Sequence, residues 1–364
     1  MTQQSVFIEP VPVPAGLDAP GAADFVAVAE LLNAQQREFW GNDDFYGPPQ
    51  AQLAGRRSTD TRRRGILAAR TGAGGGGAIV GVALVNLPLT DNLHTGTVNV
   101  VVAPSARRQG VGTRLYAAAE ELARSENRRM LMAETDHLLS GGAAEPVAGT
   151  ASLVPQDAAA SFAAGLGFRL ELVDRVSRLE LGSPEAEGAA LAQARAAAGE
   201  DYELVFWTGA CPQDLVEAYA TLRQKMSIDA PLGGLELVEE AWDEARVREA
   251  EARVRDMDAE VLVSAALQAS TGELAGHTVL EIFRNNPAVV YQDDTLVLQA
   301  HRGNRLGMLL KAANLVRLRK QMPEARRVYT WNAEENRYML SINERLGFRP
   351  VGYSGEWQKE LSAG

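Results

Sequence analysis

Two short basic turns carry the residues whose types and spacing point most clearly to chemistry. They begin at Arg107 and Arg302, 195 residues apart, and each contains glycine. Each turn follows a run of β-branched and aliphatic residues and precedes an amphipathic stretch with helical spacing. Such a turn points several backbone N–H groups outward at a helix N-terminus, where the helix dipole also favours negative charge. We therefore predict two anion-binding cradles, for which a pyrophosphate is the obvious ligand.

The two turns resemble a known sequence signature. Residues 107–112 read Arg-x-x-Gly-x-Gly, which resembles the acetyl-CoA signature of the GNAT superfamily of N-acetyltransferases. Residues 302–307 keep the first arginine and the last glycine but place Arg305 where a glycine is usual. Each copy is followed by a Leu-Gly-Phe triplet, at residues 166–168 and 346–348, which in that superfamily ends the helix before the last large strands. The chain as a whole resembles a tandem GNAT protein, a class that includes mycothiol synthases.

The resemblance implies acetyl-CoA as a cosubstrate, with its pyrophosphate on the turn and its pantetheine arm between two diverging strands. Asn336 matches a family asparagine that contacts this arm. Arg305 need not disturb the second cradle, because backbone amides do most of the holding, provided that its φ angle is not positive. The other residues implied to contact the coenzyme are Val102, Arg107, Arg108, Gln109, Gly110, Val111, Gly112 and Thr113 in the first copy, and Val297, Arg302, Gly303, Asn304, Leu306 and Gly307 in the second.

Attack of an amine on a thioester requires a base that takes a proton and a group that receives the departing thiolate. Asp293 and Asp294 enter the second cradle strand, where strand alternation lets only one of them face the cleft. A solvated pair of turn carboxylates is the alternative. The family's thiolate-protonating tyrosine is replaced by Ala163 in the first copy and by Asn343 in the second, and Asn343 can at most donate a hydrogen bond. We expect the chemistry in the second copy and structural coenzyme binding in the first.

Strands alternate with helical stretches along both halves of the chain, which predicts an α/β fold with a mixed sheet. The resemblance makes this more specific: two tandem α+β domains, each with a mixed, mostly antiparallel central sheet flanked by helices. We expect an N-terminal domain at residues 1–182, a connector at 183–200 and a C-terminal domain at 201–364. The small, polar segment 138–155 is expected to be a long loop, of a kind that functional sites often use as a lid.

Composition limits the function classes. The chain of 364 residues is long enough for two domains with a core each, and its net charge of −11 argues against a nucleic-acid partner. No apolar run approaches the roughly 18 residues that a membrane span needs. The single cysteine, Cys211, excludes a disulfide framework and suits a reducing cytoplasm, and four histidines without a close cysteine or histidine cluster predict no metal site. We expect a cytoplasmic monomer or homodimer.

Three functions fit these observations. The leading hypothesis is an acetyl-CoA-dependent N-acetyltransferase that transfers an acetyl group to a primary amine of a small molecule by direct attack in a ternary complex. The first alternative is a mycothiol-synthase-like acetylation of a cysteinyl amine. The second is a coenzyme-A-binding protein without turnover, which the missing tyrosines favour. The identity of the acceptor substrate lies beyond the sequence.

Overall fold

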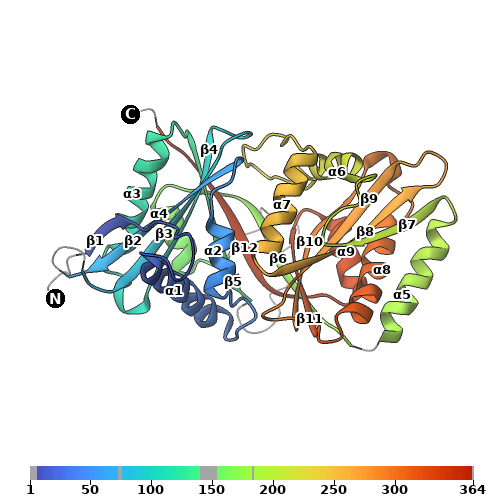
Figure 1. Cartoon of the computed structure of the whole chain (residues 1–364), viewed down its shortest axis with the longest axis horizontal. Helices are drawn as coiled ribbons and strands as arrows, with labels where there is room; N and C mark the ends of the chain where they lie inside the picture. The colour runs from blue at the N-terminus through green and yellow to red at the C-terminus, as the bar shows by residue number, and fades with distance from the viewer. Residues whose placement is uncertain (1–5, 73–75, 140–153, 183, 363–364) are drawn as a thin grey trace. The chain divides into compact units, whose positions relative to one another are not determined.

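The computed structural model of the chain describes residues 6–72, 76–139, 154–182 and 184–362 (Figure 1). These residues form two compact units. Unit 1 contains the described residues up to Leu138, those from Val154 to Leu172 and those from Gly355 onward, and unit 2 contains those from Val173 to Ser354 together with Leu139. The segment that we expected to act as a lid lies almost wholly outside the described residues.

Unit 1 is built on a sheet with the strand order β1-β2-β3-β4-β5-β12, to which β12 contributes its residues from Gly355 onward. The first four strands are antiparallel neighbours, whereas β4 and β5 are parallel. Its elements are β1 (Val6–Pro10), α1 (Ala22–Trp40), α2 (Pro49–Arg56), β2 (Arg62–Thr71), β3 (Ile79–Pro88), β4 (Thr95–Val102), η2 (Pro104–Ala106), α3 (Val111–Ser125), β5 (Met130–Leu138), α4 (Ala158–Gly165) and the end of β12 (Arg349–Glu360).

Unit 2 repeats this plan with the strand order β7-β8-β9-β10-β11-β6, in which only β10 and β11 are parallel. The mixed, mostly antiparallel sheet flanked by helices that we predicted for each half is therefore confirmed. Its elements are the end of β6 (Arg169–Glu180), α5 (Pro184–Ala198), β7 (Tyr202–Thr208), α6 (Val216–Asp229), α7 (Glu244–Asp256), β8 (Ala259–Gln268), β9 (Leu274–Phe283), β10 (Val289–Val297), η3 (Gln299–His301), α8 (Leu306–Gln321), β11 (Arg327–Ala333) and α9 (Arg337–Leu346).

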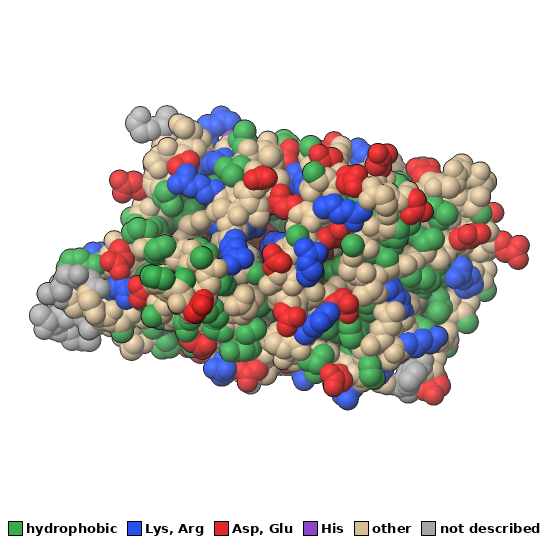
Figure 2. Space-filling model, in the orientation of Figure 1, with side chains coloured by type: hydrophobic (Ala, Val, Ile, Leu, Met, Phe, Trp, Pro, Cys, Tyr) green, Lys and Arg blue, Asp and Glu red, His purple; other side chains and the backbone are tan. Residues whose placement is uncertain are grey.

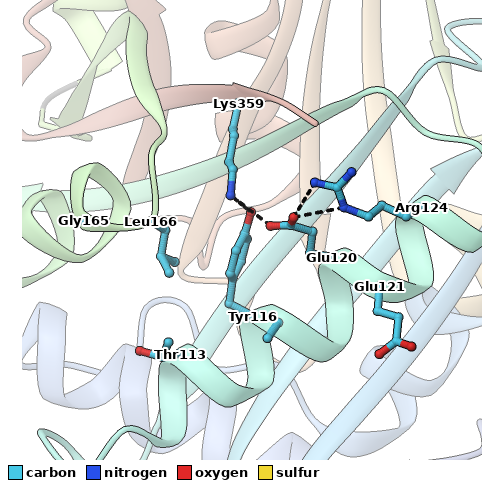
Figure 3. Close-up of a pocket in the computed structure, with 9 residues that line it drawn as sticks. Thr113, Tyr116, Glu120, Glu121, Arg124, Gly165, Leu166 and Lys359 are labelled. Carbon is cyan, nitrogen blue, oxygen red and sulfur yellow. Dashed lines mark hydrogen bonds and ion pairs between the residues drawn. The ribbon is translucent and has the colours of Figure 1, made fainter. Parts of the chain in front are cut away.

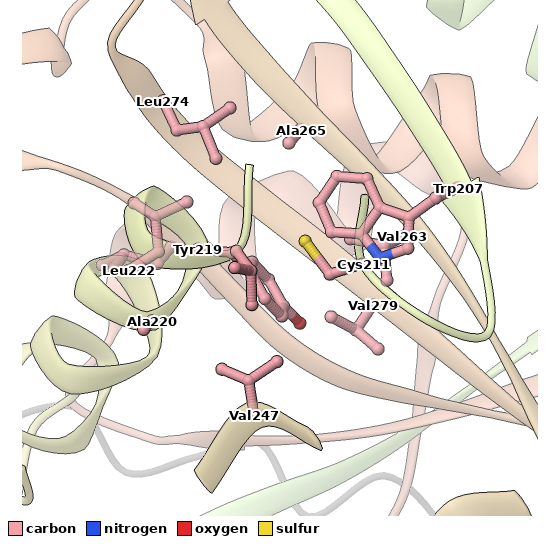
Figure 4. Packing of buried hydrophobic residues seen from close by; sticks show 12 residues of the cluster. Trp207, Cys211, Tyr219, Ala220, Leu222, Val247, Val263, Ala265, Leu274 and Val279 are labelled. Atoms are coloured by element: carbon pink, nitrogen blue, oxygen red, sulfur yellow. The ribbon is translucent and has the colours of Figure 1, made fainter. Parts of the chain in front are cut away.

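Strand β9 shows how the sequence places helices on both faces of the unit 2 sheet. Successive side chains of a strand point to opposite faces. Leu280 packs on one face in a cluster with Leu315 of α8, whereas Val279 packs on the other face with Tyr219 of α6 and Val247 of α7 (Figure 4). The strand is apolar on both faces because both are covered. Helix α5, at the expected connector, lies beside α8 and belongs to unit 2 (Figure 1).

Cys211 lies in the same apolar cluster as Val279 and Tyr219 (Figure 4). Burial raises the pKa of its thiol to about 12, so the thiol stays protonated and unreactive at neutral pH. Cys211 is therefore a core residue and not a nucleophile.

The parallel pair of strands opens at the same place in both units. Pairing of β4 with β5 ends at Thr97, and pairing of β10 with β11 ends at Gln292, which lies 195 residues later. Within the described strands, the residues of β4 and β10 beyond these points have no partner on that side. An extended ligand can add to such unpaired edges by main-chain hydrogen bonds. The two diverging strands that the resemblance implied are thus present in both units.

The next two features are the charges on the surface and the apolarity of the helices. Acidic and basic side chains are interspersed over the face drawn in Figure 2. No helix within the described ranges combines the length and apolarity that crossing a bilayer requires.

Candidate active site

The two predicted cradles have the same backbone conformation. In each, a short 3-10 turn is followed by two residues with positive φ angles, and the second of these precedes the helix. The angles are 62° at Arg108 and 79° at Gly110 in unit 1, and 91° at Gly303 and 56° at Arg305 in unit 2. Each copy therefore has one glycine and one arginine at the two left-handed positions, in opposite order. Our condition that Arg305 avoid a positive φ was wrong, because the turn forms with Arg305 in the left-handed region.

Replacing Arg305 with glycine is expected to stabilise the protein by about 0.5–1 kcal/mol. A residue with a β-carbon is strained at positive φ, and the relief of this strain exceeds the added freedom of the unfolded chain. Chemical denaturation measures the change. Arg302→Gly is the control, since Arg302 has a φ of −67° and glycine there should lower the stability. A loss of stability in Arg305→Gly would contradict the argument.

The first arginine of each turn fastens the turn to the helix before it. Arg107 donates from Nε to the carbonyl of Val102 at 3.0 Å and from its two terminal nitrogens to Glu38 of α1 at 2.8 and 2.6 Å. The positive charge of Arg107 is thereby neutralised within the protein, so the backbone N–H groups remain as the main anion donors of the turn. The equivalent set in unit 2 is Arg302, Val297 and Asp229 of α6.

The last glycine of each signature lies where two helices touch. A β-carbon at Gly112 would lie 3.1 Å from the ring of Phe162 in α4, and one at Gly307 would lie 3.0 Å from Cδ1 of Ile342 in α9. Both glycines thus let the cradle helix and the later helix approach closely. Of the other predicted contacts, Val111 and Leu306 are buried at the first helical positions, whereas Gln109 and Asn304 hydrogen-bond within their own turns, to the carbonyls of Ser105 and His301.

Two pockets flank the cradle of unit 1. One, of about 300 Å³, lies between α1 and the end of β4 and is lined by Val102 and Arg107 among others. The other, of about 430 Å³, lies between α3, the end of α4 and β12, and Thr113 lines it (Figure 3). Within the second pocket, Glu120 forms ion pairs with Arg124 at 2.7 Å and with Lys359 at 2.9 Å, so one carboxylate is shared by two cations (Figure 3).

The predicted acidic pair of unit 2 lies in a β-bulge at the point where β10 leaves β11. Between Gln292 and Thr295 the register of β10 against β9 shifts, so that Asp293 and Asp294 together face a single residue of β9. The buried amide of Gln292 fills the bulge and donates to the carbonyl of Val279 at 2.6 Å. The bulge therefore places both carboxylates beside the unpaired edge of β10.

The two carboxylates have different surroundings. Asp294 forms an ion pair of 2.7 Å with Arg223 of α6, whereas Asp293 lies 3.6 Å from the same guanidinium. Arg223 is held from its other side by the ring of Trp242, 4.7 Å away. The side chain of Asp293 is 52% exposed, and desolvation by the surrounding protein atoms, followed by the charge of the neighbouring Asp294, raises its pKa. Asp293 is thus the carboxylate better suited to accept a proton.

A third carboxylate, Glu281 of β9, lies on the same face of the sheet. Tyr291 of β10 pairs with Glu281, and Tyr329 of β11 pairs with Tyr291, so the three side chains share that face. Burial, followed by the charge of Asp293, raises the pKa of Glu281 to about 7. A carboxylate with this pKa is half ionised at neutral pH, which is the range in which a general base works best.

His277 lies four residues before Glu281 on β9, on the same face of the sheet, and adds no charge to the cluster of carboxylates. It is fully buried, its ring lies 5.3 Å from that of Tyr219, and neither ring nitrogen has a hydrogen-bond partner among the described residues. Burial lowers the pKa of His277 to about 3. It is therefore a neutral side chain at physiological pH.

Asn343 and Asn336 occupy defined places on α9. Asn343 is buried, accepts from Nζ of Lys311 at 2.7 Å and donates to Oδ1 of Asn332 at 2.6 Å. Asn336 caps the N-terminus of α9, since its side-chain oxygen accepts from the backbone of Met339 at 3.1 Å. In unit 1 the corresponding cap is Asp157 of α4.

Comparison with known proteins shows which family this geometry resembles. Residues 25–140 match the family model described as Acetyltransferase (GNAT) family. Over 99% of its length the chain is similar to a solved "Tandem GNAT protein from the clavulanic acid biosynthesis pathway", with a TM-score of 0.77, 25% identity and full coverage of that protein. The chain has the fold of a tandem GNAT protein. No curated protein matches the sequence.

Other solved structures share the fold at lower identity. A GCN5-related N-acetyltransferase from Sphaerobacter thermophilus has a TM-score of 0.61 at 15% identity, with 99% of this chain and 96% of that chain covered. A glucosamine N-acetyltransferase region of a fungal β-N-acetylglucosaminidase has a TM-score of 0.61 at 14% identity, with 98% of this chain and 38% of that chain covered. Together with the family match, the tandem GNAT similarity indicates an acetyltransferase.

The structure adds residues that the sequence analysis missed. Glu281 and Lys311 each interrupt an otherwise apolar stretch, and such isolated charges were the available signal. The sequence did not indicate a role for Arg223, because only the fold brings α6 close to the bulge. In unit 1, Asn99 stands 195 residues before Asp294, and Asp136 of β5 is a further enclosed carboxylate, whose pKa burial and then Glu134 raise to about 7.

Proposed function

We propose that the protein is an acetyl-CoA-dependent N-acetyltransferase that acts on a primary amine of a small molecule, with the chemistry in unit 2. The observation that carries this proposal is the juxtaposition, at one opened strand edge, of the cradle turn and three carboxylates on the neighbouring strands. Unit 1 has the same cradle and the same opened edge. We propose that it binds the coenzyme structurally.

The cradle fits the diphosphate of the coenzyme. Two left-handed positions, Gly303 and Arg305, precede the helix and direct the backbone N–H groups of the turn to the positive end of the α8 dipole. The unpaired residues of β10 beyond Gln292 offer main-chain groups to an extended pantetheine arm. Placement of this kind supplies much of the barrier reduction in a bimolecular acyl transfer.

The carboxylates provide the proton acceptor. An amine is protonated at neutral pH and attacks only after it has lost a proton. Asp293, at the open edge, takes this proton, and Glu281 assists as the neighbouring carboxylate on the same face. Asp294 and Arg223 neutralise each other and hold the bulge in place.

The walls of the acceptor site are aromatic. The rings of Tyr291 and Trp331 stack with their centroids 6.3 Å apart, and Tyr329 lies 6.4 Å from Trp331 on the same face. Aromatic faces attract a cationic ammonium group before it is deprotonated. This arrangement supports a small amine as the acceptor.

Turnover with a panel of small amines tests the proposal. Purified protein with acetyl-CoA is expected to release free coenzyme A thiol in the presence of at least one primary amine, and mass spectrometry of that product should show one added acetyl group. Cysteinyl amino sugars belong in the panel, because preference for them would favour the mycothiol-synthase-like alternative. Binding of acetyl-CoA by calorimetry without turnover on any amine would favour a non-catalytic coenzyme-binding protein. Absence of binding to either form of the coenzyme would refute all three functions.

A further inference from the structure

Helix α8, which follows the cradle turn of unit 2, carries a buried lysine that has no counter-ion among the described residues. Lys311 of α8 is 1% exposed, and its Nζ donates to Oδ1 of Asn343 at 2.7 Å. Among the described residues it takes part in no salt bridge, and its Nζ lies 5.6 Å from the centre of the Phe348 ring. Burial alone lowers the pKa of Lys311 to about 7. Because an unpaired buried cation destabilises the fold, its presence calls for a function.

Unit 1 offers an internal comparison. The residue 195 positions before Lys311 is Tyr116, and the phenylalanine of the triplet there is Phe168. An amine also lies near that ring, since Nζ of Lys359 is 6.0 Å from the centre of Phe168, but it comes from β12. Glu120 neutralises this amine at 2.9 Å. Unit 1 thus pairs its lysine with a carboxylate at the equivalent place.

Unit 2 has different residues at the positions equivalent to this set in unit 1. Leu315 stands where unit 1 has Glu120, so the counter-ion is missing. Asn343 stands where unit 1 has Ala163, and it joins Lys311 to Asn332 of β11. Thr330 hydrogen-bonds to Asn332 at 3.3 Å and is the last residue of β11 that pairs with β10. The polar chain therefore runs from the buried amine to the opened strand edge.

The charged groups near this chain do not compensate Lys311. Glu334, which follows β11, and Glu344 of α9 both pair with Arg175, at 2.5 and 2.9 Å. On α8 itself, Arg319 pairs with Glu187 at 3.0 Å. The positive charge of Lys311 is thus left for an anion that the reaction creates.

We propose that Lys311 is a positioning residue that stabilises the departing coenzyme A thiolate through the side-chain amide of Asn343. This inference rests on the acetyl transfer proposed above. When the amine nitrogen bonds to the acyl carbon, the carbon–sulfur bond breaks, its electron pair stays on sulfur, and the amine proton goes to the carboxylate. Asn343 uses one N–H for Asn332, which leaves the second for sulfur, and the hydrogen bond from Lys311 to Oδ1 polarises this N–H.

Titration of the thiol of bound coenzyme A tests the proposal without turnover. The ultraviolet absorbance of the thiolate is followed against pH for the native protein and for Lys311→Met, which keeps the length of the side chain. We expect the thiol pKa to be lowered on binding to the native protein and to rise by at least about one unit in Lys311→Met, which is a tenfold change in the ionisation equilibrium. Lys359→Met is the matched control in unit 1 and should leave the thiol pKa of the coenzyme A bound to unit 2 unchanged.

Kinetics and a second variant separate this role from a structural one. Lys311→Met is expected to lower kcat by about 10- to 100-fold with little change in the KM for acetyl-CoA, because the interaction forms only as the thiolate develops. Asn343→Ala should give the same shift in the thiol pKa, and the double variant should add nothing further. Equal thiol pKa values in the native protein, Lys311→Met and Asn343→Ala would overturn the inference.

The failure of this inference is distinguishable from failure of the proposed function. The native protein could bind acetyl-CoA and acetylate an amine while the thiol pKa is the same with and without Lys311. This result would refute only the role of Lys311. If the native protein binds neither form of the coenzyme, the proposed function falls and takes this inference with it.

Discussion

Conversion of Asp293 to asparagine is expected to lower kcat for amine acetylation by about 100-fold or more, while the affinity for acetyl-CoA stays unchanged. Asparagine keeps the shape of the side chain but accepts no proton, so only the proton transfer is lost. The bulge puts Asp293 at the edge where β10 and β11 separate, and its raised pKa makes it a better base than a free carboxylate. Steady-state kinetics and calorimetry with acetyl-CoA together measure the two effects.

Two neighbouring variants identify the base. Asp294→Asn is the matched control, since the same change one residue away removes the partner of Arg223 and should cost less activity. Glu281→Gln tests the other candidate. Full activity in both Asp293→Asn and Asp294→Asn would mean that neither aspartate is the base, and a larger loss in Glu281→Gln would move the role to Glu281.

The pH dependence of kcat/KM has a defined sign. Glu281 can assist Asp293 only when it is ionised, so the raised pKa of Glu281, about 7, predicts that kcat/KM falls as the pH drops through 7. This acidic limb should move or disappear in Glu281→Gln. A limb that stays at the same pH in this variant would show that another group controls it.

Introducing glutamate at Gly307 is expected to abolish turnover and to weaken acetyl-CoA binding by unit 2 by about 100-fold or more. A carboxylate beside the cradle repels the diphosphate, and like charges at such an interface cost several kcal/mol. The new β-carbon would also lie 3.0 Å from Ile342, which pushes α9 away from α8. Calorimetry gives the number of coenzyme sites and their Kd, and the thiol-release assay gives turnover.

Gly112→Glu is the matched control in unit 1, where a β-carbon would lie 3.1 Å from Phe162. Both variants introduce the same charge at the same position of the same turn, so differences in folding stress largely cancel. If unit 2 is the catalytic unit, Gly112→Glu loses one coenzyme site but keeps turnover. The reverse result, with turnover lost in Gly112→Glu and kept in Gly307→Glu, would place the chemistry in unit 1.

The sequence predicted the tandem fold and the two glycine-containing turns before helices, because both depend on local patterns, whereas anion binding by these turns stays a prediction. The strand, the short glycine turn and the following helix are consecutive in the chain, at residues 95–125 in one copy and 289–321 in the other. The repeat of this order at a constant spacing made the prediction specific. The conformation of Arg305 was missed because the sequence does not distinguish an arginine in the left-handed region from one in the right-handed region.

The candidate site was only partly predictable, because its charges meet through the fold. Asp293 and Asp294 could be singled out as an acidic pair at a strand entrance, but the bulge that aims them depends on the amide of Gln292. Arg223 reaches the same point from a helix about 70 residues earlier. Lys311 lies on a helix that sequence periodicity treats as an ordinary amphipathic one, and only packing shows that its amine is sealed inside.

The paths of β6 and β12 determine whether the chain can be divided into two complete units. Strand β6 starts among the residues of unit 1 and ends in unit 2, whereas β12 starts in unit 2 and finishes in unit 1. A cut anywhere in the middle of the polypeptide therefore leaves both pieces with an incomplete sheet. Each copy can complete its sheet only when both halves of the polypeptide are present.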